Sequence, residues 1–217
     1  MTPLRKHRRW PWVVGLAVCL FAWPAFVLVG TLYGWWQRPL APAGDAGAFA
    51  EAVVGKIKTQ RRGNVVFVLI QAGKPVREYA ATAGEPVDRD SLFQVASLSK
   101  WISAWGVMTL VEAGKIDLDK PVANYLKRWK LPKSEFNNDA DTVRRLLSHT
   151  AGLTDGLGYG GFAPGAEVQS LEGSLTRAAD ASLNADGRVR VGIAPGARWR
   201  YSGGGYTLLQ LIVEEVS

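Results

Sequence analysis

The 217-residue sequence predicts an α+β protein, with an antiparallel sheet flanked by helices and a helical subdomain, preceded by one N-terminal transmembrane helix. Residues 10–37 contain no charged side chain, and residues 64–84 follow a strand, turn and strand pattern. Residues 97–113 and 206–216 have the apolar spacing of helices. The hydrophobic fraction of 47% is enough for a folded core and excludes a chain that is disordered throughout.

The uncharged segment 10–37 is predicted to be a transmembrane anchor. A helix rises about 1.5 Å per residue and the hydrocarbon core is roughly 30 Å thick, so this segment is long enough to cross it. Four bases lie before it in residues 1–9 and one, Arg38, follows it. We therefore expect a cytoplasmic basic tail, a single pass through a bacterial inner membrane, and a periplasmic domain beyond it. The alternative is a signal peptide cleaved near the small-residue triplet at 41–43, followed by secretion.

The net charge of +7 does not indicate a nucleic-acid partner. Five of the 26 Lys and Arg residues lie in residues 1–38, which contain no acid, and the rest of the chain has 21 bases against 19 acids. The single cysteine, Cys19, lies inside the predicted anchor, so no thiol is expected in the exported part. That part has one histidine and no metal-ligand spacing. We expect no metal, no cofactor and no nucleic acid.

The chain after the anchor is predicted to be a linker and one domain. Residues 38–48 are rich in Pro, Ala and Gly, as tethers are, and residues 49–217 form the domain. Its first part is predicted to contain a short amphipathic helix and then two antiparallel strands that form a hairpin. The first helix is predicted at 49–59 and the two strands at 64–71 and 76–84. Two long helices are predicted at 97–113 and 206–216, and two short helical pieces at 122–126 and 142–147.

Ser97 and Lys100 form a Ser-x-x-Lys motif at the predicted start of a helix. Side chains three positions apart lie on one helix face, so the amine of Lys100 can approach the hydroxyl of Ser97 and accept its proton during attack. The unpaired backbone N–H groups of a first helical turn suit an oxyanion hole. A motif of this length also arises by chance, so its surroundings decide its meaning.

Three blocks of the chain resemble the serine β-lactamase and penicillin-binding-protein family. The similarity is strongest to the branch of class C β-lactamases and D-alanyl-D-alanine carboxypeptidases. Residues 92–100 with 110–119, residues 146–153 and residues 195–206 follow one another in the family's order. The resemblance implies a β-lactamase/transpeptidase-like fold.

The resemblance also implies a role for three residues. Ser97 would be the acylated nucleophile, Lys100 its proton partner, and Tyr201 the phenol that relays a proton to the leaving group. Gly203 stands where the family's Tyr-x-Asn motif has asparagine. No Lys-Thr-Gly or His-x-Gly follows Tyr201, so we expect a domain that is incomplete at its C-terminus.

The function predicted from these motifs is that of a serine hydrolase acting through an acyl-enzyme on an amide or ester. The substrate would be a small molecule or a peptidoglycan-type compound: a β-lactam, a D-Ala-D-Ala-type peptide or a small ester. Motifs of this kind indicate the reaction and leave the substrate open. One alternative is a non-hydrolytic penicillin-binding or wall-sensing module. Another is an inactive fragment of the hydrolase.

Two other signals are interpreted as structural. His149 is the single histidine after the anchor, but Ser148 beside it is badly placed as its partner and no Gly-x-Ser-x-Gly is present. Residues 156–161 satisfy Gly-x-Gly-x-x-Gly without a preceding strand or a following helix. We expect a loop beside the cleft there, with no dinucleotide site.

Overall fold

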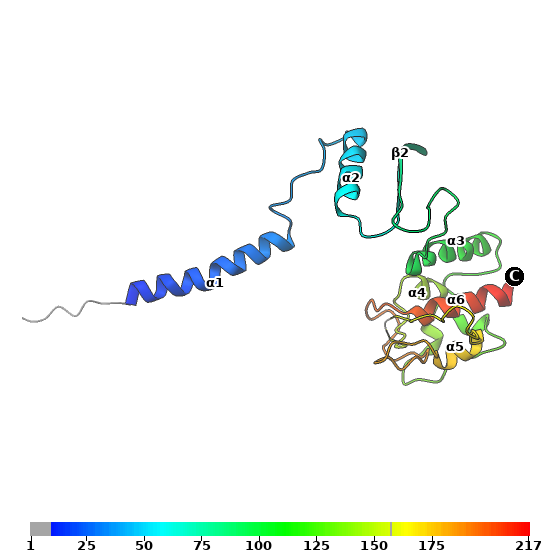
Figure 1. The fold of residues 1–217 in the computed structure, drawn as a ribbon. Helices are drawn as coiled ribbons and strands as arrows, with labels where there is room; N and C mark the ends of the chain where they lie inside the picture. Colours follow the sequence, from blue (N-terminus) through cyan, green and yellow to red (C-terminus); the bar gives the residue numbers. More distant parts are fainter. Residues whose placement is uncertain (1–9, 157) are drawn as a thin grey trace, which may run out of the picture. The chain divides into compact units, whose positions relative to one another are not determined.

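A computed structural model of the chain describes residues 10–156 and 158–217. They form two compact units, one ending at Phe93 and the other comprising Gln94–Ser217 (Figure 1). The predicted cytoplasmic tail, residues 1–9, lies outside the described residues.

The first helix, α1, covers Trp10–Leu32 and contains Pro24. In the described ranges, no helix is both long and apolar enough to cross a membrane. The structure therefore gives no support to the transmembrane span predicted over residues 10–37, and that span stays a prediction.

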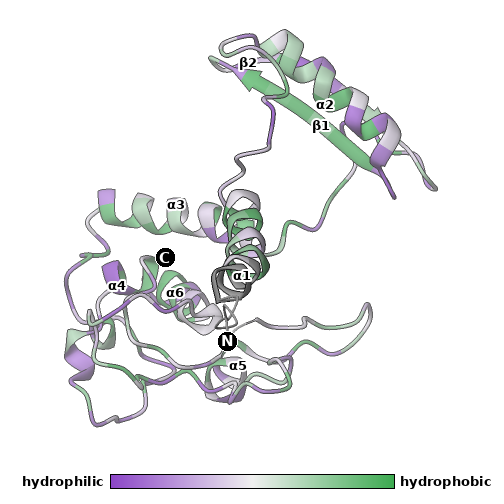
Figure 2. Ribbon diagram, turned by 90° about the vertical axis from the view of Figure 1, so that its left-hand side faces the viewer, coloured by the Kyte–Doolittle hydropathy of each residue, from purple (hydrophilic) through white to green (hydrophobic). Residues whose placement is uncertain are grey.

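The rest of the first unit is a helix packed on a hairpin. Helix α2 (Ala46–Gln60) contacts strands β1 (Val65–Gln71) and β2 (Lys74–Ala81), which pair antiparallel as predicted. A two-residue turn joins the strands, with left-handed backbone at Ala72 (φ 48°) and Gly73 (φ 74°), a conformation that matches the twist of a hairpin. Side chains of β1 alternate between half-buried and exposed from Val65 to Ile70, although all six are apolar, and the hydrophobic colour of most of β1 in Figure 2 shows this.

The second unit is built around α6 (Gly203–Val216), which contacts α3 (Ser99–Glu112), α4 (Val143–Leu147) and α5 (Leu171–Arg177) (Figure 1). Short 3₁₀ turns lie at Ala96–Leu98, Val122–Asn124 and Asn138–Ala140. The core consists of apolar residues from α6 and from the segments around it: Val107, Ile116, Val122, Leu126, Val143, Leu146, Ala151, Leu153, Leu175, Val189, Val191, Leu208, Leu209, Leu211 and Ile212.

Two differences from the predicted elements have local causes. Helix α6 begins three residues earlier than expected, because the hydroxyl of Ser202 caps it by accepting a hydrogen bond from the Gly205 N–H at 2.8 Å. Helix α5 was not predicted. It has only seven residues, which is too short for an apolar period to show, and the hydroxyl of Ser170 caps it.

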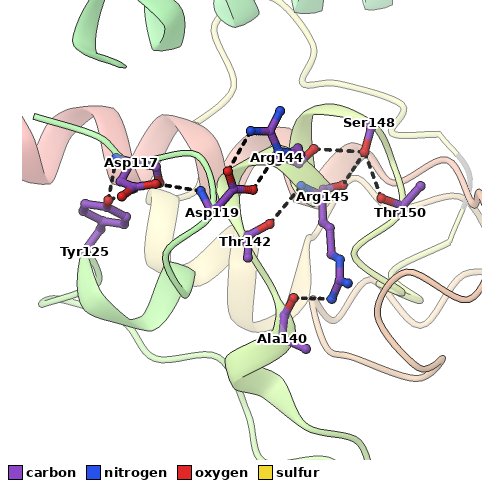
Figure 3. A network of polar contacts seen from close by, with 9 residues as sticks. All are labelled: Asp117, Asp119, Tyr125, Ala140, Thr142, Arg144, Arg145, Ser148 and Thr150. Carbon is purple, nitrogen blue, oxygen red and sulfur yellow. Dashed lines mark hydrogen bonds and ion pairs between the residues drawn. The ribbon is translucent and has the colours of Figure 1, made fainter. Parts of the chain in front are cut away.

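Helix α4 is held on the unit by polar contacts at both of its ends (Figure 3). Arg144 donates two hydrogen bonds of 2.7 Å to the carboxylate of Asp119, and Thr142 caps the first turn by accepting from the Arg145 N–H. At the other end the hydroxyl of Ser148 donates to the Arg144 carbonyl at 2.9 Å. These contacts fix the turn after α4, which leads to the candidate site.

Candidate active site

Ser97 and Lys100 lie where the chain enters α3. Ser97 is in the 3₁₀ turn before the helix and Lys100 is in its first turn. The Lys100 ammonium donates a hydrogen bond of 3.2 Å to the Ser97 hydroxyl. Ala96, before them, has a left-handed backbone (φ 45°), which is uncommon for a residue with a side chain and marks a constrained turn beneath Ser97. Ser97 is exposed and Lys100 is half-buried.

Tyr201 completes the group from the far end of the sequence. Its phenol shares a hydrogen bond of 2.7 Å with the hydroxyl of Ser97, and the Lys100 nitrogen lies 5.2 Å from its ring centroid. Burial raises the pKa of Tyr201, but hydrogen bonds with Lys100 and Ser97 and the charge of Lys100 outweigh it, so the pKa lies below its ordinary value. The structure thus brings the three residues predicted from the sequence within direct reach of one another.

A buried carboxylate, Asp155, holds the segment that carries Tyr201. It is 1% exposed and accepts three hydrogen bonds: from the Ser202 hydroxyl, from the Gly204 N–H at 3.0 Å, and from the Tyr159 phenol at 2.7 Å. Ser202 follows Tyr201 directly, so Asp155 fixes the backbone beside that phenol. Burial and the charge of Asp155 raise the pKa of Tyr159 above its ordinary value, which keeps the phenol protonated as a donor.

Gly203 lies against the ring of Tyr159. A Cβ added at Gly203 would overlap Tyr159 Cε2, and one added at Gly204 would overlap Val189 Cγ2. The close approach of the Tyr159 ring therefore requires glycine at position 203, where the resembling family has asparagine.

His149 also belongs to this site, which the sequence reasoning did not expect. Its ring centroid lies 4.6 Å from that of Tyr201, and its Nδ1 accepts a hydrogen bond of 3.3 Å from the Ser202 N–H. No hydrogen bond joins His149 to Ser97 or to Ser148 in the described structure, so the arrangement is not a Ser-His-Asp triad.

A cavity of about 700 Å³ opens beside Lys100, between α3 and α6. Gly203 and the rings of Tyr159, Phe162 and Tyr206 line part of its wall. Polar side chains such as Gln169 and Asp180 line the rest, and a mixed hollow of this kind next to a hydrogen-bonded serine and lysine has the form of a small-molecule site.

Asp155 and Tyr159 were missed by the sequence reasoning. One signal was present: Asp155 is the single charged residue in residues 151–166. A lone carboxylate among apolar and glycine residues is a candidate for burial with specific partners. In the residues that the structure describes, no cluster of three or more His, Cys, Asp or Glu side chains could hold a metal ion.

Comparison with known proteins places these features in a family. A family model described as Beta-lactamase matches residues 49–217. Over 130 residues the chain is 33% identical to esterase EstB of Burkholderia gladioli, an alignment that covers 55% of this chain and 31% of the esterase. Over 136 residues it is 35% identical to penicillin-binding protein 4* of Bacillus subtilis, covering 63% of this chain and 28% of that protein.

A solved structure has the same fold. The octameric penicillin-binding protein homologue from Pyrococcus abyssi matches with a TM-score of 0.58 and 26% sequence identity, covering 79% of this chain and 39% of that one. The chain thus spans about a third of the length of the curated relatives it matches.

Proposed function

The chain belongs to the β-lactamase family, and on that premise we propose that it is a serine hydrolase that transfers an acyl group from an ester or amide to Ser97. The observation that carries the proposal is the hydrogen-bonded group at the start of α3. The Ser97 hydroxyl lies 2.7 Å from the Tyr201 phenol and 3.2 Å from the Lys100 nitrogen. Relatives named as an esterase and as penicillin-binding proteins support the same general chemistry.

The proposed reaction has two steps. In the first, Ser97 Oγ forms a bond to the substrate carbonyl carbon, and its proton passes to Tyr201. The bond between that carbon and the leaving oxygen or nitrogen then breaks, and the leaving group takes the proton. In the second step water adds to the acyl carbon, the acid is released, and a proton returns to Ser97 Oγ.

Lys100 and Tyr201 have different parts in this proposal. Lys100 donates to Ser97 Oγ, so the hydroxyl proton of Ser97 is free to point to Tyr201. The cation beside Tyr201 favours the phenolate, which agrees with the lowered pKa of that phenol. Tyr201 is therefore the base in the acylation step, and Lys100 stabilises its charged form.

Labelling with a covalent probe tests the proposal. A fluorescent penicillin or a fluorophosphonate should acylate or phosphonylate the protein, and peptide mapping should find the adduct on Ser97. Ser97→Ala should abolish labelling, whereas the control Thr109→Ala, which removes an exposed hydroxyl of α3 that does not line the cavity, should label like the wild type. The proposal is wrong if Ser97 stays unmodified and Ser97→Ala changes no hydrolytic activity.

The second candidate is a penicillin-binding or wall-sensing module that is acylated without turnover. It is favoured by Gly203, because the ring of Tyr159 lies where the resembling family has an amide side chain. Burst kinetics separate the two functions. A stoichiometric burst without further product supports the sensor, and sustained product formation supports the hydrolase.

The location of the domain is a further part of the proposal. The uncharged segment 10–37, with more bases before it than after it, supports a periplasmic domain tethered to the inner membrane. Removal of residues 1–38 should shift the protein from the membrane fraction to the soluble fraction. Recovery of a wild-type protein that begins near Asp45 would support the cleaved-signal alternative.

A further inference from the structure

The backbone of His149 has an unusual conformation, and two hydrogen bonds fix it. His149 follows α4 by two residues, and its φ of 56° lies in the left-handed region, which most side chains avoid. Its N–H donates to the Leu146 carbonyl at 3.2 Å, and its carbonyl accepts from the Arg200 N–H at 2.8 Å. The second contact ties the turn after α4 to the segment that leads into Tyr201.

The side chain of His149 holds Tyr201 and its neighbour Ser202. Its ring lies 4.6 Å from the Tyr201 ring at an interplanar angle of 35°, and 5.3 Å from the Tyr206 ring at 36°. The edge-on ring of Trp199 is 6.1 Å away. The His149 Nδ1 accepts from the Ser202 N–H. His149 therefore contacts the face of the Tyr201 ring and also fixes the backbone that follows it.

Acceptance of that hydrogen bond requires an unprotonated Nδ1, so the bonded form of the ring is neutral with its proton on Nε2. The charged and titratable groups around it are Lys100 from α3, Tyr201 and Tyr206 beside its ring, and the buried Asp155. Burial and the charge of Lys100 lower the pKa of His149, against the smaller opposing effect of Asp155. Neutral His149 is thus favoured in the same arrangement that holds Lys100 beside Tyr201.

We propose that His149 is a positioning residue for Tyr201. The neutral ring of His149 holds the Tyr201 phenol against Ser97, and the protonated ring of His149 releases it. Protonation places a donor at Nδ1 opposite the Ser202 N–H and adds a second cation beside Lys100. The clash with the Ser202 N–H displaces the backbone next to Tyr201, and the repulsion displaces Lys100, so the phenol leaves Ser97 Oγ and the acylation rate falls. The inference rests on the proposed function, because the rate it concerns is that of Ser97 acylation.

Two substitutions, His149→Asn and His149→Gly, remove the titrating ring while they allow residue 149 to keep its left-handed backbone. Asparagine tolerates left-handed backbone, and its side-chain oxygen can accept the Ser202 N–H without binding a proton near neutral pH. Glycine tolerates the same φ and removes the acceptor. The control is Glu135→Gln, which removes an exposed carboxylate outside the site.

The pH dependence of fluorophosphonate labelling at Ser97 tests the proposal. The wild-type labelling rate should fall on acidification below the ordinary pKa of histidine, about 6.5. In His149→Asn the part of this fall that His149 causes should disappear, so that only the pH dependence set by Tyr201, the proposed base, remains, with a rate at about pH 8 within about threefold of wild type. In His149→Gly the rate at about pH 8 should fall about tenfold to 100-fold, as expected for a displaced reacting group. Glu135→Gln should follow the wild-type profile.

A proton NMR titration gives a readout that does not depend on activity. The chain has two histidines, His7 and His149, so the ring signal that is lost in His149→Asn belongs to His149 and the remaining signal to His7. Because the charge of Lys100 lowers the His149 pKa, Lys100→Met should raise that pKa. This shift tests the electrostatic part of the inference, the charge of Lys100 acting on the ring, and the labelling profiles test the effect of His149 on Tyr201.

The outcomes are distinct. The inference is wrong, and the proposed function stands, if the wild type is labelled and either of two results is found. One is a fall in rate at acid pH in His149→Asn that equals that of the wild type, and the other is a wild-type rate in His149→Gly. A wild type in which Ser97 is never labelled overturns the proposed function and the inference together. Loss of the His149-dependent part of the fall at acid pH in His149→Asn, together with a raised His149 pKa in Lys100→Met, supports the inference.

Discussion

The ring of Tyr159 occupies the space that a side chain at position 203 would need, so Tyr159 and Gly203 form a matched pair. The phenol of Tyr159 is in turn fixed by its hydrogen bond to the buried Asp155. A larger side chain at position 203 would therefore displace the Tyr159 ring. Through Asp155, that displacement would also disturb the segment that carries Tyr201.

The first prediction concerns this pair. Gly203→Ala should lower the free energy of unfolding by about 2 kcal/mol, because the added methyl group overlaps the Tyr159 ring. In a Tyr159→Ala background the same change should cost much less, and denaturant titrations of the double-mutant cycle measure this coupling. The control is Gly205→Ala, where an added Cβ would meet Ser202 and Leu153 instead. Equal costs of Gly203→Ala in both backgrounds would contradict the pairing.

The second prediction concerns Asp155. Asp155→Asn puts an amide where a buried carboxylate accepts three hydrogen bonds, so at least one donor loses its partner. We expect a loss of about 3 kcal/mol in the free energy of unfolding and slower labelling of Ser97. Asp139→Asn, at an exposed carboxylate, should change neither quantity. Wild-type stability in Asp155→Asn would show that the carboxylate does not fix this segment.

The third prediction concerns Asp141, a fully buried carboxylate whose two oxygens have no hydrogen-bond partner among the described residues. Burial raises its pKa from 3.8 to about 7, despite the opposing charge of Arg145. Between about pH 4 and 7 the folded state binds more protons than the unfolded state, so the free energy of unfolding falls as the pH rises. The total fall attributable to Asp141 is on the order of 4 kcal/mol and levels off above about pH 7.

Denaturant titrations across this pH range check the third prediction. Asp141→Asn should flatten the dependence and stabilise the protein at the alkaline end, because no charge is then buried. Asp119→Asn, which removes an exposed carboxylate paired with Arg144, should leave the fall in place. An unchanged slope in Asp141→Asn would show that Asp141 is not the titrating group.

The fourth prediction compares two tyrosines near Lys100. Tyr201→Phe removes the phenol that contacts Ser97 Oγ, and should slow labelling of Ser97 by about 100-fold or more, the usual loss of a general base. Tyr206→Phe keeps the ring 5.5 Å from the Lys100 nitrogen and loses only a 3.2 Å hydrogen bond to the Leu147 carbonyl. It should label within about fivefold of wild type. Similar rates in the two variants would remove Tyr201 from its proposed role.

The elements that the sequence predicted well are those governed by local rules. The hairpin of β1 and β2 and the helices α2, α3 and α6 lie where apolar period, turn residues and caps place them. Ser97 and Lys100 meet because positions three apart share one face at a helix start, so their contact also follows from local geometry.

The contacts that complete the site join residues far apart in the chain. Tyr201 reaches Ser97 across 104 positions, and Asp155 reaches Ser202 across 47. His149 was interpreted as structural because its sequence neighbours offered no partner, yet the fold places it on Tyr201. Which distant groups share a buried space depends on packing, and neither period nor motif spacing specifies packing.

The sequence by itself determined the hairpin, the main helices, and the serine and lysine that lie together at the start of α3, because those features depend on residues close in the chain. Only the tertiary structure decided that Asp155 holds the segment of Tyr201, that Tyr159 excludes a side chain at Gly203, and that His149 lies against Tyr201. The reason is physical: burial and charge at a site are set by groups that the fold brings together, whatever their distance along the chain.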